Sequence, residues 1–175
     1  MAEIKILSLN TSLQIRKALS EILIEVVANG GSVSFMHPLE IEAADSFWGN
    51  SLAAAARGER VVLGAFHRKD LVGTVTLLLD CPPNQPHRAE IAKLMTRVNY
   101  RRKGVAKMLM HAAERIAIEK KRTLLVLDTA TEDGAAKFYE SIGYNFVGEI
   151  PGYALKPHGG LTGTRIYWKR PGSDA

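Results

Sequence analysis

Residues 90–144 read EIAKLMTRVNYRRKGVAKMLMHAAERIAIEKKRTLLVLDTATEDGAAKFYESIGY, and the spacing of their apolar residues changes several times. Runs that suit an extended chain alternate with spacings that suit a helix. In order, they predict a strand, a long helix, a buried strand and a short helix, over residues 89–98, 104–120, 123–128 and 134–141. This alternation indicates an α/β fold, with helices layered on a sheet, rather than a helix bundle or a β-sandwich.

The rest of the chain extends this pattern in both directions. The turn at 68–70 predicts that the strands on either side of it form an antiparallel hairpin. The last two strands are expected to be joined by a glycine-rich loop. Strands are expected over 4–9, 60–67, 71–79, 144–149 and 164–169, and helices over 13–27 and 39–57.

The composition is that of a soluble globular protein. The chain has 175 residues, of which 46% are hydrophobic and 23% charged, so we expect a single domain over 1–175 with its own core. No apolar run approaches the length of a membrane span, and the N-terminus lacks the apolar core of a secretory signal. The single cysteine, Cys81, has no partner for an internal disulfide. We therefore expect a cytoplasmic protein with no membrane partner.

Basic residues cluster between the strand at 89–98 and the long helix. The net charge is +5, and a helix start carries unpaired N–H groups and the positive end of the helix dipole. The cluster therefore favours a phosphate-bearing ligand, and nucleic acid is disfavoured because no basic sheet with interleaved aromatics accompanies it. By itself, the segment 101–106 fits an ordinary charged helix start equally well. The clustered residues are Arg97, Arg101, Arg102, Lys103 and Lys107.

Two segments together resemble the GNAT superfamily of N-acetyltransferases. Residues 101–106 resemble its motif A, Arg/Gln-x-x-Gly-x-Gly/Ala, with Arg101, Gly104 and Ala106 at the fixed positions. Residues 135–144 resemble its motif B, Ala-x-x-x-Tyr-x-x-x-Gly-Phe/Tyr. The resemblance implies the GNAT fold, in which helices flank a central mixed and twisted β-sheet and two central strands splay apart to bind acetyl-CoA.

The same resemblance implies which residues bind acetyl-CoA. Backbone N–H groups of residues 94–96 are expected to polarise the thioester carbonyl, and this segment is expected to pair with the pantetheine arm like an added strand. The helix start would hold the pyrophosphate. The implied residues are Leu94, Met95, Thr96, Arg101, Arg102, Lys103, Gly104, Val105, Ala106 and Lys107, and no metal is expected.

Three side chains are candidates for the proton transfers that acetylation of an amine requires. By resemblance, Glu90 and Asp128 lie on neighbouring strands and act as a water-linked general base, and Tyr139 protonates the leaving thiolate. The residues alone favour simpler interpretations. Glu90 would be an exposed edge carboxylate, Asp128 a strand-end cap and Tyr139 a core aromatic.

Longer stretches are similar to the tabtoxin-resistance acetyltransferases, GNAT enzymes that acetylate a β-lactam amino-acid toxin. The similarity implies an acceptor that is a small-molecule amine, either amino-acid-like or an antibiotic or toxin, and a role in resistance. Phe35 and Tyr153 are expected to frame the acceptor site. The similar stretches are residues 30–36, 88–95, 120–129, 147–153 and 164–169.

Two other functions stay open at this point. One is acetylation of a protein or peptide amine, and the other is a non-catalytic acyl-CoA sensor. No nucleic-acid partner is expected, and the protein is expected to be a monomer or a homodimer.

Overall fold

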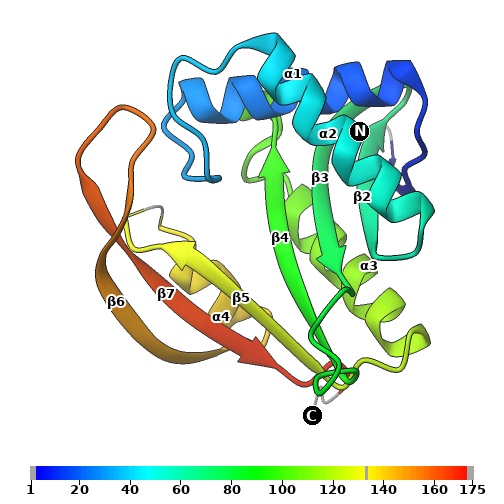
Figure 1. Ribbon diagram of the computed structural model, residues 1–175, viewed down its shortest axis with the longest axis vertical. Helices are drawn as coiled ribbons and strands as arrows, with labels where there is room; N and C mark the ends of the chain where they lie inside the picture. The colour runs from blue at the N-terminus through cyan, green and yellow to red at the C-terminus, as the bar shows by residue number, and fades with distance from the viewer. Residues whose placement is uncertain (1–2, 133, 173–175) are drawn as a thin grey trace.

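A seven-stranded sheet runs through the computed structural model, which describes residues 3–132 and 134–172 (Figure 1). The strands lie in the order β1-β2-β3-β4-β5-β7-β6, and β4 and β5 are the parallel pair. Residues 1–2, 133 and 173–175 of the predicted domain lie outside the described residues. The strands are β1 Ile4–Ser8, β2 Arg60–His67, β3 Asp70–Leu78, β4 Arg88–Thr96, β5 Leu124–Ala130, β6 Asn145–Leu155 and β7 Leu161–Lys169.

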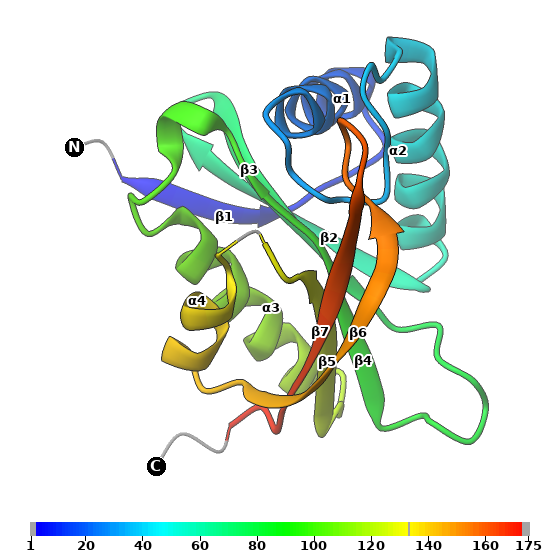
Figure 2. The same ribbon diagram turned by 90° about the vertical axis from the view of Figure 1, so that its left-hand side faces the viewer.

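Helices cover both faces of this sheet, as Figure 2 shows. Helices α1 (Leu13–Ala28) and α2 (Ile41–Ala56) pack on one face, and α3 (Val105–Glu119) and α4 (Ala136–Ser141) pack on the other. A short 3-10 turn, η1 (Val98–Tyr100), leads from β4 towards α3. The mixed sheet between helices confirms the predicted fold class. No helix within the described ranges is long and apolar enough to cross a membrane.

Each face of the sheet has its own apolar core. The core beneath α3 and α4 includes Leu109 and Leu125, and the core beneath α1 and α2 includes Leu19 and Trp48. All four of these side chains are 0% exposed. Since buried apolar area is the main source of folding free energy, both layers hold the sheet rigidly on either side of its centre.

The two central strands separate part of the way along their length. Strands β4 and β5 pair only where residues 88–90 lie beside residues 124–126. Beyond Glu90, β4 continues beside β3 while β5 continues beside β7, so the two strands diverge towards their C-terminal ends (Figure 1). The predicted splay of the central strands is therefore present, and it leaves one edge of β4 without a strand partner.

A β-bulge at Lys93 changes the direction of side chains within β4. Between its pairings with Thr76 and Thr74 of β3, β4 advances by three residues instead of two. Lys93 has a φ of 51°, which residues other than glycine adopt infrequently. As a result of the extra residue, Leu94 packs towards α3 while Met95 packs towards α1 and α2. The bulge lies at the opening between β4 and β5.

The C-terminal hairpin differs from the sequence prediction. A loop with two glycines does join the last two strands, but its predicted extent is wrong, because β6 continues to Leu155 and β7 begins at Leu161. The register of the pairing with β7 shifts between Ile150 and Ala154, and the proline and glycine lie within this irregular segment of β6. Only residues 156–160 form the turn, and this long hairpin reaches the loop that follows α1 (Figures 1 and 2).

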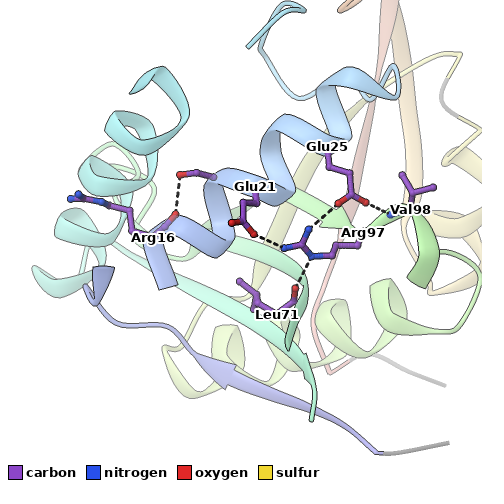
Figure 3. Close-up of polar contacts among 7 residues, drawn as sticks. Arg16, Glu21, Glu25, Leu71, Arg97 and Val98 are labelled. Carbon is purple, nitrogen blue, oxygen red and sulfur yellow. Dashed lines mark hydrogen bonds and ion pairs between the residues drawn. The ribbon is translucent and has the colours of Figure 1, made fainter. Parts of the chain in front are cut away.

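Arg97 holds α1 against the end of β4 (Figure 3). Its guanidinium donates to Glu25 at 2.9 Å, to Glu21 at 3.2 Å and to the backbone carbonyl of Leu71 at 3.0 Å. Glu25 also accepts the backbone N–H of Val98 at 2.6 Å. Arg97 therefore serves the fold, although it belongs to the basic cluster that favours a phosphate-bearing ligand.

A buried ion pair joins α3 to β7. Lys169 Nζ lies 3.1 and 3.0 Å from the two carboxylate oxygens of Glu114, and it donates to the carbonyl of Ile142 at 2.8 Å. The two side chains are 3% and 7% exposed. Because Ile142 caps the C-terminus of α4, this contact links α3, α4 and β7 at one point.

Candidate active site

A cavity of about 420 Å³ occupies the opening between β4 and β5. Both strands line it, together with the loop after α1, the start of α3, helix α4 and the β6–β7 hairpin. The lining residues are Val26, 31–34, 91–96, Arg101, Ala106, 128–130, Ala135, Phe138, Tyr139, 153–155 and 162–164. The splayed strands therefore bring the two sequence motifs to one concave site.

The start of α3 presents backbone N–H groups to this site. The first helical hydrogen bond runs from the N–H of Met108 to the carbonyl of Gly104, so the N–H groups of residues 105–107 have no acceptor within the helix. Gly104 has a φ of 81°, and no atom lies within 4 Å of the position that a Cβ would take. Arg101 and Ala106 line the cavity. This geometry suits an anion, as predicted from residues 101–106.

The other predicted phosphate ligands lie around this helix start without lining the cavity. Arg102 and Lys107 are exposed, and the Lys103 ammonium lies 5.0 Å from the centre of the Tyr100 ring. The side chain of Val105 is 1% exposed and belongs to the core. Any contact of Val105 with a phosphate would therefore come from its backbone N–H.

The unpaired edge of β4 supplies the second part of the donor site. Leu94, Met95 and Thr96 all line the cavity, on the stretch of β4 that has separated from β5. The exposed edge of a strand offers backbone donors and acceptors in a row. An amide-containing chain could pair with it as an added strand, and the same N–H groups could polarise a carbonyl.

The two predicted carboxylates occupy different positions. Asp128 lines the cavity, and its carboxylate accepts a hydrogen bond from Thr164 of β7 at 2.9 Å. Glu90 lies at the last paired position of β4 and β5, where the strands begin to separate, and is not one of the lining residues. Its carboxylate lies 3.4 Å from the guanidinium of Arg88. The predicted neighbouring strands are present, but Asp128 alone of the pair faces the cavity.

Tyr139 combines the two interpretations that the sequence left open. It is 7% exposed and packs among other aromatic rings, with centroids 6.0 Å from Tyr144 and 5.9 Å from Tyr167. It also lines the cavity, from α4. A core position of this kind fixes the ring, which favours a defined direction for its hydroxyl group.

The two predicted acceptor residues also differ. Tyr153 lines the cavity from β6. Phe35 is not among the lining residues and packs edge-on against Phe47 of α2, with ring centroids 5.2 Å apart. Phe35 thus packs against the core beneath α1 and α2.

Sequence reasoning missed Lys93 and Ser34. Lys93 Nζ donates to Ser34 Oγ at 3.1 Å and lies 5.7 Å from the centre of the Phe47 ring, and both polar residues line the cavity. The adjacent apolar residues Leu94 and Met95 break the strand alternation, and this break was the available signal for the bulge that places Lys93 here.

Metal-binding residues do not gather in the described part of the chain. Among residues 3–132 and 134–172, no group of three or more His, Cys, Asp and Glu side chains could hold a metal ion.

Solved structures with the same fold include several acetyltransferases. An N-acetyltransferase from Staphylococcus aureus Mu50 is 16% identical and superimposes with a TM-score of 0.82, over 97% of this chain and 99% of that one. A ribosomal-protein-alanine N-acetyltransferase from Brucella melitensis is 19% identical, with a TM-score of 0.80 over 95% and 99% of the two chains. A structure described as an acetyltransferase from Salmonella typhimurium with its cofactor acetyl-CoA is 13% identical, with a TM-score of 0.79 over 98% and 96%.

A family profile gives the stronger assignment. The profile described as the Acetyltransferase (GNAT) family matches residues 27–144, which include the splayed strands, the start of α3 and α4. This match covers well over half of the chain and contains every element of the predicted donor site. The chain therefore belongs to the Acetyltransferase (GNAT) family of acetyl-CoA-dependent N-acetyltransferases.

Proposed function

We propose that this protein transfers an acetyl group from acetyl-CoA directly to the amine of a small, amino-acid-like molecule. The observation that carries the proposal is the single cavity in which the start of α3, the unpaired edge of β4, Asp128 and Tyr139 meet. A site of this kind holds a donor and an acceptor side by side, which converts a bimolecular reaction into an effectively unimolecular one.

The residues present fit acetyl-CoA. Acetyl-CoA supplies an acetyl group activated as a thioester. The N–H groups at the start of α3, with Arg101 beside them, suit the pyrophosphate, and the open backbone at Gly104 leaves room for it. The edge of β4 at residues 94–96 suits the amide-containing arm and the thioester carbonyl.

Replacing Gly104 by valine is expected to weaken acetyl-CoA binding about 10- to 100-fold, because its side chain would occupy the open space beside the N–H groups of the helix start. Relief of the left-handed backbone, which costs a branched residue about 1–3 kcal/mol, would also shift those N–H groups. Isothermal titration calorimetry with acetyl-CoA measures the change. Gly58 provides a matched control, since it also has a φ near 80° (79°) and no atom within 4 Å of a Cβ, but follows α2 away from the cavity. Gly58→Val should destabilise the fold and leave affinity unchanged. Equal affinity for wild type and Gly104→Val would contradict the phosphate site.

Asp128 is the proposed general base. An acceptor amine is mostly protonated near neutral pH, and it must lose a proton before it can attack the thioester. Asp128 lines the cavity, and its bond from Thr164 fixes the carboxylate while leaving lone pairs for the acceptor or for a bridging water. Glu90, at the point where β4 and β5 separate, would assist Asp128 through a bridging water or through its charge.

Tyr139 is the proposed general acid. Its hydroxyl would hold the proton that the sulfur of the departing thiolate takes up. With the donor, the base and the acid in the same cavity, the acetyl group would pass directly from acetyl-CoA to the amine. It would not be attached covalently to the protein.

The contacts at the acceptor end favour a small molecule over a protein. The loop after α1 and the hairpin turn meet there, where the N–H of His37 donates to the carbonyl of Pro157 at 2.9 Å. The imidazole of His158 lies 3.0 Å from the carbonyl of Ala28 and 4.5 Å, centre to centre, from the ring of His37. These contacts join two segments that both contribute to the cavity lining, and we infer that a wall closed in this way favours a small acceptor over an extended peptide.

An acceptor screen with thiol release as the readout tests the proposal. The panel contains amino acids, aminated antibiotics and β-lactam amino acids, polyamines, and peptides with free N-termini or lysines. Preference for small amines supports the proposal, whereas preference for peptides assigns a protein acceptor. Acetyl-CoA binding without release of thiol on any amine would instead identify a sensor. If an antibiotic or toxin is the best acceptor, resistance of cells that produce the protein becomes the biological test.

Asp128→Asn is expected to lower kcat/KM about 100- to 10,000-fold for the acceptor found in this screen, because the amide cannot take up a proton. The asparagine carbonyl can still accept the bond from Thr164, so the site should keep its shape. Glu90→Gln is the matched comparison and should cause a smaller loss. A larger loss for Glu90→Gln than for Asp128→Asn would move the base to Glu90, and equal losses would indicate a water-linked pair.

A further inference from the structure

Lys93 places a positive charge in the wall of the cavity, beside the loop after α1. The bulge in β4 directs it towards the loop after α1, where its ammonium donates to Ser34 Oγ and lies over the ring of Phe47. Both Lys93 and Ser34 have positive φ values, 51° and 76°. Strained backbone of this kind is retained where the surrounding structure requires it, and it concentrates at ligand sites.

The Lys93 ammonium has no ion-pair partner within 4 Å among the residues that the structure describes. Its contacts are a neutral hydroxyl and an aromatic face. Burial lowers the pKa of Lys93, and the more distant charges of Asp128 and Glu90 raise it in opposition. A half-buried ammonium with only neutral contacts is incompletely satisfied, so it is prepared to bind an anion.

We propose that Lys93, together with Ser34, binds the carboxylate of the acceptor, so that the substrate is an amine that also carries a carboxylate group. This inference rests on the proposed acetyltransferase function and adds to it the residues that recognise the carboxylate of an amino-acid-like acceptor. The charges in the cavity are complementary to such a molecule. Its carboxylate pairs with Lys93, while its ammonium group faces Asp128, which removes the proton before acetyl transfer.

Two other roles for Lys93 make different predictions. If the side chain has only a structural role and fills space against Phe47, changing Lys93 should lower kcat/KM equally for all acceptors. A role as a general base predicts a loss of kcat for all acceptors. Binding of a carboxylate predicts a loss confined to acceptors that have one, and seen mainly in KM.

The experiment compares wild type, Lys93→Met and Lys93→Arg on amino acids and their matching carboxamides, with thiol release as the readout. Lys93→Met keeps the length and apolar stem of the side chain but removes its charge. We expect kcat/KM for the amino acid to fall about 10- to 100-fold, mainly through KM, because a hydrogen bond to a charged group is lost. The loss with the carboxamide should not exceed about threefold, and Lys93→Arg should retain most of the activity on the acid.

A pH series adds a readout that a structural role would not move. The ratio of kcat/KM between wild type and Lys93→Met on the amino acid should decline as the pH rises. The reason is that burial lowers the pKa of Lys93, so it loses its proton at a lower pH than an ordinary lysine. In Lys93→Arg the advantage over Lys93→Met should persist, since arginine stays charged. Comparing variants on the same acceptor cancels the different amine pKa values of the acid and the carboxamide.

The Lys93→Met protein is expected to fold. A lysine whose pKa is lowered in the folded state opposes folding below that pKa, and the effect disappears as the pH rises through its ordinary value. Removing the charge should therefore leave the melting temperature at neutral pH equal to or above that of wild type. Circular dichroism and calorimetric binding of acetyl-CoA confirm that the donor site is intact.

The possible failures are distinguishable. If wild type acetylates polyamines, carboxamides or peptides in preference to every carboxylated amine, the carboxylate site and the amino-acid-like acceptor are overturned, while acetyltransferase activity itself is retained. If Lys93→Met loses activity on acid and carboxamide alike, the carboxylate site alone is overturned. If no amine is acetylated although acetyl-CoA binds, the proposed function fails. Calorimetry of N-acetylated amino acids with the protein and CoA then still tests Lys93. Binding that weakens in Lys93→Met supports the site, and its absence overturns it.

Discussion

Tyr139→Phe is expected to lower turnover about 100- to 10,000-fold while leaving the affinity for acetyl-CoA within about twofold of wild type, since a positioned acid contributes about this much. The ring packs beside Tyr144 and Tyr167, so phenylalanine can keep every apolar contact. Only the hydroxyl of this cavity-lining residue is lost. Stopped-flow or steady-state thiol release gives kcat, and calorimetry with acetyl-CoA gives the affinity.

Tyr144→Phe is the matched control for this experiment. Its hydroxyl is buried and has no hydrogen-bond partner within the described structure, and burial raises its pKa well above the ordinary value for tyrosine. A buried polar group without a partner opposes folding, so removing it should preserve turnover and leave stability unchanged or slightly higher. If Tyr139→Phe behaves like Tyr144→Phe, then Tyr139 is a core residue and the general acid lies elsewhere.

Removing one partner of the buried pair Lys169–Glu114 is expected to have the largest effect on stability, about 3–5 kcal/mol for Lys169→Met or Glu114→Gln. Each change leaves a charged or polar group in a region where these two side chains are 3% and 7% exposed. The Lys169 change also removes the hydrogen bond to the carbonyl of Ile142 at the end of α4. Urea denaturation followed by circular dichroism measures the free energy of unfolding.

A double variant separates the cost of an isolated charge from the contribution of the pair. In Glu114→Leu with Lys169→Met both charges are absent, so most of the stability lost in the single variants should return. Arg165–Glu149 is a comparison pair, with side chains 36% and 40% exposed, and breaking it should cost at most about 1 kcal/mol. If the single variants at Lys169 and Glu114 lose no more stability than a variant that breaks the Arg165–Glu149 pair, the assignment of a tightly buried pair is contradicted.

The order of strands and helices was predictable because local patterns produce it. The long helix α3, the buried strand β5 and the hairpin of β2 and β3 all lie within a few residues of their predicted bounds. The C-terminal hairpin was not predicted at its full length, since Pro151 and Gly152 read as loop residues. In the structure a register irregularity accommodates them, and pairing with β7 continues beyond.

The roles of individual charged residues were harder to predict. The sequence does not distinguish Arg97 from the other basic residues of its cluster, yet in the structure two glutamates of α1 form ion pairs with it. Those glutamates are more than seventy positions away in the chain. Glu90 and Asp128 read as an equivalent pair, but the splay begins between them, so that one faces Arg88 and the other faces the cavity. Which of them carries the base role stays a prediction.

The sequence by itself therefore determined the fold class, the family and the segments predicted to form the donor site. Those features depend on short-range patterns, namely apolar periodicity, a glycine at a helix start and motifs that each lie on one element. The tertiary structure alone decided which charged side chains line the cavity. One extra residue in β4 redirects Lys93 into the cavity, and the divergence of β4 from β5 determines which carboxylate lines it. Both depend on pairings between strands distant in sequence, whose register no local pattern specifies.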